Sequence, residues 1–443
     1  MRKMTLCIAL AVSLPLVMSG LAAEEPIVKP KDASFEKFQP SPLPPAVPFE
    51  FKKGDRLAIC GDSITEAVMY SRMIETYLTV CRPELEVAVR THGKGGETTP
   101  KFRSRISGEV LRFKPTVVSL CYGMNDHGYR PETKSGGIAN YYQDNLTAIV
   151  KTFTDAKVKV LLGSPGCIGK LPPWDFVREE AKTDEPLNLN LCGLRNRTIE
   201  LAKEKKLPYA DTFWNMFVAR YEARKRFGTD YELCGADGVH PNWAGHVVMA
   251  YGFLKAFGFD GDLGLIEVDL AAKSAKAEKG HKIKDFTQDT VAITSSRYPY
   301  CGDGEIDSDK SVRSGMSLVP FNREFNRLTL KVTGATAKEY TITWGKASRV
   351  YSAEALAKGI NLADDFPNNP FSEPFKKVNE AVLAKQKYEA EQTWKVFPIY
   401  PGNEKREDYK ALIERSESKR KEMVQAIQTA FVPVTHSIRI TPK

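Results

Sequence analysis

Four short motifs in this 443-residue sequence contain the residue types needed for acyl transfer through a serine nucleophile. A serine hydroxyl attacks a carbonyl efficiently when a histidine takes its proton and a carboxylate orients that histidine. Backbone N–H groups of glycines and an asparagine amide can stabilise the negative charge that develops on the carbonyl oxygen. Each motif alone is also a common turn or cap composition, so the prediction depends on their combination. The motifs are "GDSIT", "HGKGGETT", "YGMNDH" and "DGVHPN", which begin at Gly61, His92, Tyr122 and Asp237.

The segments around these motifs have the pattern of buried strands separated by helices. Residues 56–60, "RLAIC", and 116–123, "TVVSLCYG", are continuous apolar runs, as expected of parallel strands covered on both faces. Residues 67–80, 141–156 and 191–206 have apolar residues at helical spacing. Alternating strands and helices predict a parallel sheet between two helical layers. Such sheets bind ligands at the carboxyl ends of their strands, where we expect the motifs to meet.

This combination resembles the SGNH hydrolases, also called GDSL esterases, in the motifs "GDSIT", "GxxGETT", "GMND" and "DGVHPN". The resemblance implies a flavodoxin-like three-layer α/β/α sandwich with a parallel sheet. It implies that Ser63 is the nucleophile and that His240 and Asp237 are the base and the acid that orients it. It also implies an oxyanion hole made by the N–H groups of Ser63 and Gly96 and the side-chain amide of Asn125. This chemistry needs no metal and no organic cofactor.

The resemblance covers roughly residues 54–258, and the sequence pattern changes after that. The accessory region that follows has short segments in which apolar and polar residues alternate, which is typical of half-buried antiparallel strands. A charged helical hairpin interrupts these strands at about residues 353–431. We therefore expect a signal peptide at residues 1–23, a proline-rich lead-in at 24–50, the hydrolase domain at 51–260 and the accessory region at 261–443.

Two segments of the accessory region, residues 326–334 and 339–345, are separated by a short turn and are expected to form a β-hairpin. The two long helices that follow are charged and amphipathic, and Asn403 is a candidate cap for the second. A coiled-coil dimer is an alternative, but the apolar positions lapse around Ser416–Arg420. The default role of these helices is a solvated face, and the alternative is a platform that extends the binding surface.

The N-terminus predicts export to a secreted or periplasmic location. Arg2 and Lys3 precede an apolar run that ends in small residues at Ala22 and Ala23, which is the pattern of a cleavable signal peptide. No later run approaches the ~18 apolar residues of a membrane helix, so stable membrane insertion is not expected. The formal charge is +9, from 64 Lys and Arg and 55 Asp and Glu. The basic residues are scattered, which argues against nucleic-acid binding, and the oligomeric state stays open.

Seven cysteines remain when Cys7 leaves with the signal peptide, and their pairing stays open. Two of them lie within apolar strand-like runs, where cysteine is usually a small buried hydrophobe. Three others, Cys167, Cys192 and Cys234, lie in or near loops and could pair in an oxidising compartment. No spacing resembles a zinc site. The seven are Cys60, Cys81, Cys121, Cys167, Cys192, Cys234 and Cys301.

The expected reaction is ester hydrolysis by a Ser–His–Asp triad. An exported enzyme with a β-rich accessory region, and without an extended apolar segment that could form a lid, favours O-deacetylation of a carbohydrate or polysaccharide. The partner would then be a small-molecule or polysaccharide ester. The alternatives are a lipase or acyl-thioesterase, a transferase that passes the acyl group to a sugar, and a non-catalytic polysaccharide-binding protein on this scaffold. The complete set of five motif residues argues against the binding protein.

Overall fold

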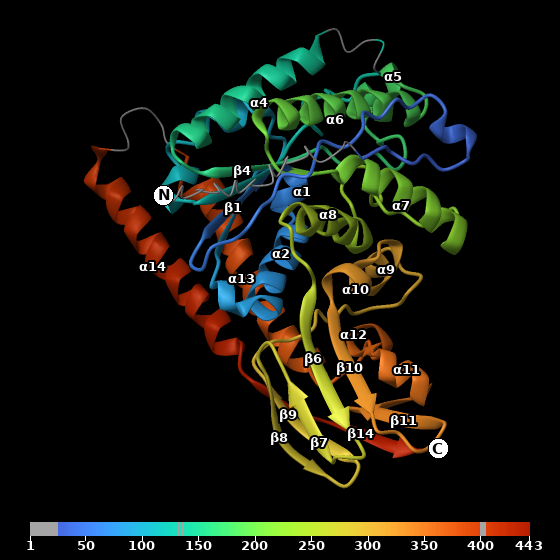
Figure 1. The fold of residues 1–443 in the computed structure, drawn as a ribbon. Helices are drawn as coiled ribbons and strands as arrows, with labels where there is room; N and C mark the ends of the chain where they lie inside the picture. The colour runs from blue at the N-terminus through green and yellow to red at the C-terminus, as the bar shows by residue number, and fades with distance from the viewer. Residues whose placement is uncertain (1–24, 132, 134–136, 399–404) are drawn as a thin grey trace, which may run out of the picture.

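The N-terminal part of the chain folds around a parallel sheet (Figure 1). The computed structural model describes residues 25–131, 133, 137–398 and 405–443, so the expected signal peptide and Asn403 lie outside the described residues. The strands are β1 (Arg56–Gly61), β2 (Ala88–Gly93), β3 (Val117–Cys121), β4 (Lys159–Gly163) and β5 (Tyr209–Ala210). In this described part they form one five-stranded sheet in the order β2-β1-β3-β4-β5. This is the flavodoxin-like order, and the predicted fold class is confirmed.

Helices cover both faces of this sheet. They are α1 (Ser63–Glu66), α2 (Tyr70–Cys81), α3 (Thr99–Arg105), α4 (Ile138–Asp155), α5 (Asp175–Glu180), α6 (Glu185–Lys205), α7 (Thr212–Phe227) and α8 (Trp243–Ala256). Helices α2, α7 and α8 pack on the face that carries Leu57 and Ile59 of β1. Helices α3, α4 and α6 pack on the face that carries Ala58 and Cys60. This alternation along one strand explains why β1 is apolar throughout.

One helix of this layer, α7, was not predicted from the sequence. Its first turns carry large apolar residues on nearly all sides, including Phe213, Trp214 and Phe217, so no clear amphipathic period marks it. The lead-in explains this composition, because it packs over the outer side of α7. Phe35 in the 3-10 helix η1 (Ala33–Phe35) and Phe38 are almost fully buried, with ring centroids 5.2 and 4.5 Å from that of Phe217.

The described residues of the accessory region form two further sheets, a mixed one in the order β13-β10-β6-β7 and an antiparallel one in the order β12-β11-β14-β9-β8. Its strands are β6 (Asp262–Asp269), β7 (Ser274–Ala277), β8 (His281–Thr287), β9 (Thr290–Ser295), β10 (Arg327–Thr333), β11 (Glu339–Trp344), β12 (Ala347–Ser352), β13 (Ile360–Asn361) and β14 (Val434–Pro442). Its helices are α9 (Val312–Leu318), α10 (Phe321–Phe325), α11 (Ala353–Lys358), α12 (Leu362–Asp365), α13 (Ser372–Lys395) and α14 (Glu407–Ala430). The expected antiparallel strands and helical hairpin are therefore present.

The predicted hairpin between β10 and β11 is wrong, because these strands lie in different sheets. β10 pairs in parallel with β6 along its length. β11 instead pairs with β12, to which it is joined by a two-residue turn with Gly345 at φ +64°. A tight turn with a glycine in the left-handed region forms a hairpin more readily than the longer connection from Gly334 to Lys338.

The helical hairpin of α13 and α14 lies along β2, the edge strand of the parallel sheet. An edge strand has backbone groups without a partner strand. Here Lys385 Nζ and Arg420 Nη2 donate to the Val89 carbonyl at 2.8 and 3.0 Å. The Glu389 carboxylate accepts the Thr91 N–H at 3.1 Å. One face of the hairpin therefore covers the edge of the sheet with charged side chains and is not a solvated face.

Lys385 lies at the centre of a buried ionic cluster between the hairpin and α2. Its Nζ atom is 2.8 Å from Glu389 Oε1 and 3.1 Å from Glu75 Oε1. Arg420 Nε adds a contact of 2.6 Å to Glu389 Oε1. Burial raises the pKa of Glu389, but Lys385, Arg420 and Arg90 outweigh it and bring the pKa to about 2. Glu389 is therefore ionised, and its charge depends on these cations.

Replacing Lys385 with Met should lower the free energy of unfolding by roughly 3–5 kcal/mol, because two buried carboxylates lose their shared cation. Lys395→Met is the matched control, since Lys395 lies on the same helix and forms a similar pair with Glu391 but is 72% exposed. The control should change stability by less than about 0.5 kcal/mol. Chemical denaturation measures both, and equal effects would contradict the account of how the hairpin docks.

Candidate active site

Ser63 lies in the turn between β1 and α1, at the carboxyl end of the sheet. Asp62 accepts the N–H of Ile64 at 3.0 Å and so caps α1. The residue before Asp62 must be a glycine, because a Cβ at Gly61 would lie 2.0 Å from Thr65 Oγ1. This close approach of β1 and α1 leaves the Ser63 side chain half-buried, with its hydroxyl turned towards the loop before α8.

Asp237 and His240 lie in one tight turn before α8. Asp237 Oδ1 accepts the N–H groups of Val239 and His240, both at 2.9 Å, and Oδ2 is 2.6 Å from His240 Nδ1. Gly238 has a φ of +79°, and a Cβ there would lie 2.4 Å from the Lys170 carbonyl oxygen. Burial raises the pKa of Asp237, but the hydrogen bonds from His240 and the two N–H groups outweigh it, so the pKa is lowered. The carboxylate therefore faces the imidazole in its charged form.

The three side chains form a continuous line of hydrogen bonds. Ser63 Oγ is 2.8 Å from His240 Nε2, although the two residues are 177 positions apart. With a carboxylate at Nδ1, a neutral imidazole has its proton on Nδ1 and presents the lone pair of Nε2 to the serine. This geometry suits transfer of the serine proton to His240 and attack by Oγ on a carbonyl. The structure thus brings Ser63, His240 and Asp237 into contact.

Gly96 and Asn125 lie in neighbouring loops that touch each other. Asn125 Nδ2 donates to the Glu97 carbonyl at 3.1 Å, and Tyr129 Oη donates to Asn125 Oδ1 at 3.4 Å. These contacts orient the amide, whose second N–H can donate to a developing oxyanion. Gly96 has a φ of +66°, is exposed, and has open space around the position of a Cβ. The structure therefore places these two predicted donors side by side.

The glycine loop, residues 93–97, is held between α1 and an ion pair. A Cβ at Gly93 would lie 2.2 Å from the backbone nitrogen of Glu66, so the loop passes directly against α1. At its other end the Glu97 carboxylate accepts two hydrogen bonds from Arg105, at 2.7 and 2.6 Å. Bidentate pairs of this kind fix orientation as well as position. Gly96 therefore lies in a loop that is anchored on both sides.

An accessory-region residue that was not predicted, Asp309, bridges the segments that precede and follow the Asp237–His240 turn. Asp309 Oδ2 accepts the Glu232 N–H at 3.2 Å and Asn242 Nδ2 at 2.9 Å. The Asp309 carbonyl accepts the Ala244 N–H at 3.0 Å. Asp309 lies in a loop of mixed polar residues with no motif of its own, so no local signal could have identified it. The accessory region is thus part of the framework that holds the acid and the base.

Aromatic residues that were also not predicted lie next to Asn125. The Tyr129 ring is 4.9 Å from that of Trp174 and perpendicular to it. Trp174 in turn stacks on Phe176, with ring centroids 6.0 Å apart. Phe176 is 56% exposed. In the sequence these aromatic residues form no motif and look like ordinary loop or core residues. The cluster is therefore visible only in the fold.

The other histidines are buried and do not join the line of hydrogen bonds at Ser63. Burial lowers the pKa to about 4 for His92 and His127 and to about 3 for His246. His246 stacks on Tyr70. In the accessory region, His281 and His436 both contact Ser295 Oγ, at 2.7 and 2.9 Å. These histidines are neutral core residues.

The cysteines that precede the proposed oxyanion donors are buried, as predicted for Cys60 and Cys121. Cys167 and Cys234 are thiols with their Sγ atoms 3.6 Å apart. They join the loop after β4 to the segment that leads into the Asp237–His240 turn. Cys192, the third of the cysteines expected in or near loops, lies within α6, and pairing among the three stays a prediction.

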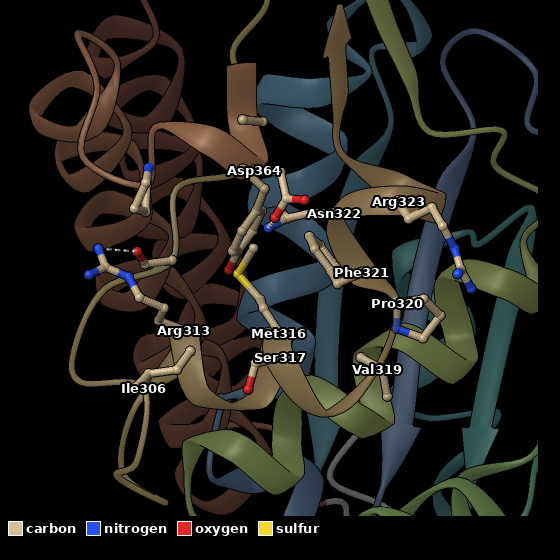
Figure 2. A pocket seen from close by; sticks show the side chains of 14 residues that line it. Ile306, Arg313, Met316, Ser317, Val319, Pro320, Phe321, Asn322, Arg323 and Asp364 are labelled. Carbon is tan, nitrogen blue, oxygen red and sulfur yellow. Dashed lines mark hydrogen bonds between the residues drawn. The ribbon is translucent and has the colours of Figure 1, made fainter. Parts of the chain in front are cut away.

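A separate cavity of about 390 Å³ lies in the accessory region, near α9, α10 and α12 (Figure 2). Phe321 and Met316 line its apolar side, and Asn322 donates to Asp364 at 2.9 Å on its polar side. No histidine is among its lining residues, so it has no base for the single serine there, Ser317.

Across the residues that the structure describes, no group of three His, Cys, Asp or Glu side chains is arranged to hold a metal. In the same part of the chain, no helix has the length and apolar character needed to cross a membrane.

Residues 59–248 match the model of the GDSL-like lipase/acylhydrolase family. An acetylxylan esterase of Geobacillus stearothermophilus is 24% identical over 225 residues, which cover 47% of this chain and 95% of that protein. A solved structure of an acetylxylan esterase from the same organism has a TM-score of 0.38 at 22% identity, covering 48% of this chain and 97% of the other. A gut microbial diltiazem-metabolizing enzyme has a TM-score of 0.70 at 23% identity, covering 90% of this chain and 99% of the other.

Residues 59–248 are thus a segment of the GDSL-like lipase/acylhydrolase type, the type of the SGNH hydrolases, and the chain is a hydrolase of ester bonds. The family match spans the sheet strands and loops that carry all the predicted site residues. The diltiazem-metabolizing enzyme shares the fold over nearly the whole chain. The accessory region is therefore not peculiar to this sequence.

Two buried carboxyl groups in the motifs around the proposed site, those of Asp62 and Asp126, have raised pKa values. Burial raises the pKa of Asp62 to about 7, with a smaller contribution from the nearby Asp126 and Glu97 carboxylates and an opposing one from the Ile64 N–H. Burial likewise raises the pKa of Asp126 to about 6, against hydrogen bonds from Thr99. The unfolded chain therefore releases the Asp62 proton at lower pH than the folded protein does. As the pH rises from about 4 to about 7, this difference lowers the stability of the fold.

Asp62→Asn should remove this loss of stability at higher pH, because the asparagine side chain does not ionise. Its amide oxygen can still accept the Ile64 N–H. Relative to wild type, the variant should gain roughly 1–4 kcal/mol of stability between pH 4 and pH 8. Denaturation at the two pH values measures the difference, with Asp155→Asn as a control because that carboxylate is 64% exposed. A stability difference between Asp62→Asn and wild type that does not change with pH would show that the Asp62 pKa is not raised.

Proposed function

We propose that this protein is an exported serine esterase that removes O-acetyl groups from a carbohydrate or polysaccharide. The observation that carries the proposal is the line of hydrogen bonds from Ser63 through His240 to Asp237, beside the glycine loop. A line of this kind is the arrangement by which hydrolases on unrelated folds activate a serine. Ser63, His240 and Asp237 are accordingly the proposed catalytic residues.

The first half of the reaction makes an acyl-enzyme. His240 Nε2 takes the Ser63 proton as Oγ attacks the ester carbonyl carbon, and Asp237 stabilises the imidazolium that forms. The carbonyl oxygen becomes negative and accepts hydrogen bonds from the N–H groups of Ser63 and Gly96 and from Asn125 Nδ2. The intermediate then breaks its bond to the alcohol oxygen, which takes the proton from His240. The alcohol leaves and the acyl group stays on Ser63.

The second half releases the acid. His240 takes a proton from a water molecule, whose oxygen attacks the acyl carbon of the Ser63 ester. The same donors hold the second oxyanion. The bond to Ser63 Oγ then breaks, Oγ recovers its proton from His240, and acetate leaves. Every step uses side chains and backbone groups of this chain.

The choice of a carbohydrate ester rests on three supports. A relative matched over most of its length is an acetylxylan esterase. The sequence has no extended apolar segment that could close over a long acyl chain. The accessory hairpin borders the glycine loop and adds surface beside the site. A lipase or acyl-thioesterase of the same family is the competing assignment, and substrate chain length distinguishes the two.

Export is supported by the pattern of residues 1–23, and N-terminal sequencing of the mature protein would find Ala23 or Glu24 first.

Ser63→Ala should lower kcat on 4-nitrophenyl acetate roughly 10⁴–10⁶-fold, because the nucleophile is lost while the fold is kept. The double variant Ser63→Ala/His240→Ala should be scarcely worse than the single one, since the two residues act as a unit. Ser104→Ala is the matched control, because Ser104 is exposed and its hydroxyl bonds only within its own helix. Turnover by Ser63→Ala close to that of wild type would reject the assignment of the nucleophile.

The same proteins assign the substrate class when they are given 4-nitrophenyl octanoate and an acetylated xylo-oligosaccharide. Wild type should release acetate from the oligosaccharide with a higher kcat/KM than it shows for the octanoate. The reverse ranking would place the protein with the lipases.

A further inference from the structure

An exposed tryptophan from the accessory region lies beside the glycine loop. Trp394 is the last residue but one of α13 and is 46% exposed. Its neighbours on the helix, Gln392 and Thr393, are almost fully buried. The exposed part of Trp394 is a large aromatic surface with a polar N–H at one edge. Trp394 is therefore the residue at this end of α13 that presents an aromatic surface to solvent beside the glycine loop.

The Trp394 ring is held in a fixed orientation by the helix that carries the nucleophile. Its Nε1 atom donates to Glu66 Oε1 at 2.6 Å. Glu66 is the last residue of α1, which begins at Ser63, and its other carboxylate oxygen accepts the Gly95 N–H. A single carboxylate therefore links the ring to both the nucleophile helix and the glycine loop. The side chain is ordered before any ligand arrives, which lowers the entropic cost of binding.

The ring also lies close to the proposed oxyanion donor. A Cβ at Gly95 would be 3.7 Å from an atom of the indole ring, and Gly96 is the next residue. The Lys94 ammonium lies over one face of the ring, 5.0 Å from the ring centroid. A ligand on this surface would meet an apolar face and a cation with three donors. These groups suit a sugar ring, which has an apolar C–H face and a rim of hydroxyl groups.

We propose that Trp394, with Lys94, forms a sugar subsite that binds a pyranose ring of the substrate chain next to the residue whose acetyl ester is cleaved. This inference rests on the proposed function and gives the hairpin a role in substrate selection. The ring stacks on the C–H face of the sugar, and Lys94 donates to its hydroxyl or ring oxygens. Small acetate esters lack this second sugar, so only a saccharide substrate can use the subsite.

Trp394→Ala should raise KM for an acetylated xylo-oligosaccharide roughly tenfold and leave kcat within about twofold, as expected for loss of one aromatic stack. The ratio of kcat/KM for the oligosaccharide to that for 4-nitrophenyl acetate should fall by about the same factor. Trp394→Phe keeps an aromatic face but has no donor for Glu66, and it should retain most of the ratio. Val350→Ala is the control, because it removes a side chain of similar exposure, 44%, from β12.

Equal losses on both substrates would overturn the proposal, because they would show that Trp394 positions the glycine loop through Glu66. No loss on either substrate would also overturn it. A loss on 4-nitrophenyl octanoate alone would assign the ring to an acyl chain instead of a sugar.

Binding without catalysis separates this inference from the proposed function. Calorimetric titration of the Ser63→Ala protein with unacetylated xylohexaose should give a Kd that Trp394→Ala weakens roughly tenfold. If wild type released no acetate from saccharides but this binding difference remained, the proposed function would fail and the subsite would stand. If the Kd were unchanged while wild type deacetylated the oligosaccharide, the subsite would fail and the function would stand.

Discussion

Ser63 Oγ and His240 Nε2 must meet within hydrogen-bond distance although they come from opposite ends of the hydrolase sequence. At 2.8 Å this contact leaves little tolerance, because a shift of one ångström would break the path of the proton. Each partner is therefore fixed by its own set of restraints. Ser63 follows a strand that is buried from Leu57 to Gly61, and Gly61 allows β1 and α1 to approach closely. His240 is held by both oxygens of Asp237 in a turn that only glycine at position 238 can adopt without strain.

The accessory region takes part in both sets of restraints. Asp309 bridges the segments that precede and follow the Asp237–His240 turn. The hairpin of α13 and α14 covers the open edge of β2, the strand that leads into the glycine loop. The accessory region is thus built into the framework of the site and is not an appended module. Residues far from the family motifs therefore contact the segments that carry Asp237, His240 and the glycine loop.

The local parts of this arrangement could be predicted from the sequence. The apolar runs of β1 and β3 and the helical periods between them are sufficient for the parallel sheet, and the sheet brings the motifs to one end. Ser63, Asp237 and His240 were selected because their motifs occur together, each at a predicted strand end or loop of one sheet, and because this combination resembles the SGNH hydrolases. The five selected residues lie at this end of the structure, and their catalytic roles remain predictions.

The predictions that were wrong or missing concern residues whose partners are distant in the sequence. β10 and β11 look like a hairpin because they are adjacent and similar, but each finds a better partner elsewhere. Lys385 and Glu389 resemble a solvated helix pair, because nothing in the helix itself shows that β2 lies against them. Asp309 and Trp394 belong to no sequence motif. Their positions near the site follow only from how the accessory region packs on the hydrolase domain.

The central claim is that Ser63 is the reacting nucleophile and that His240 activates it. Covalent labelling with a fluorophosphonate tests this directly, because such reagents transfer their phosphorus to an activated serine oxygen and release fluoride. Peptide mass spectrometry should find one adduct, on Ser63, in wild type, and the rate of labelling should fall at least about a hundredfold in His240→Ala. An adduct on another residue, or labelling of Ser63 at an unchanged rate without His240, would contradict the account.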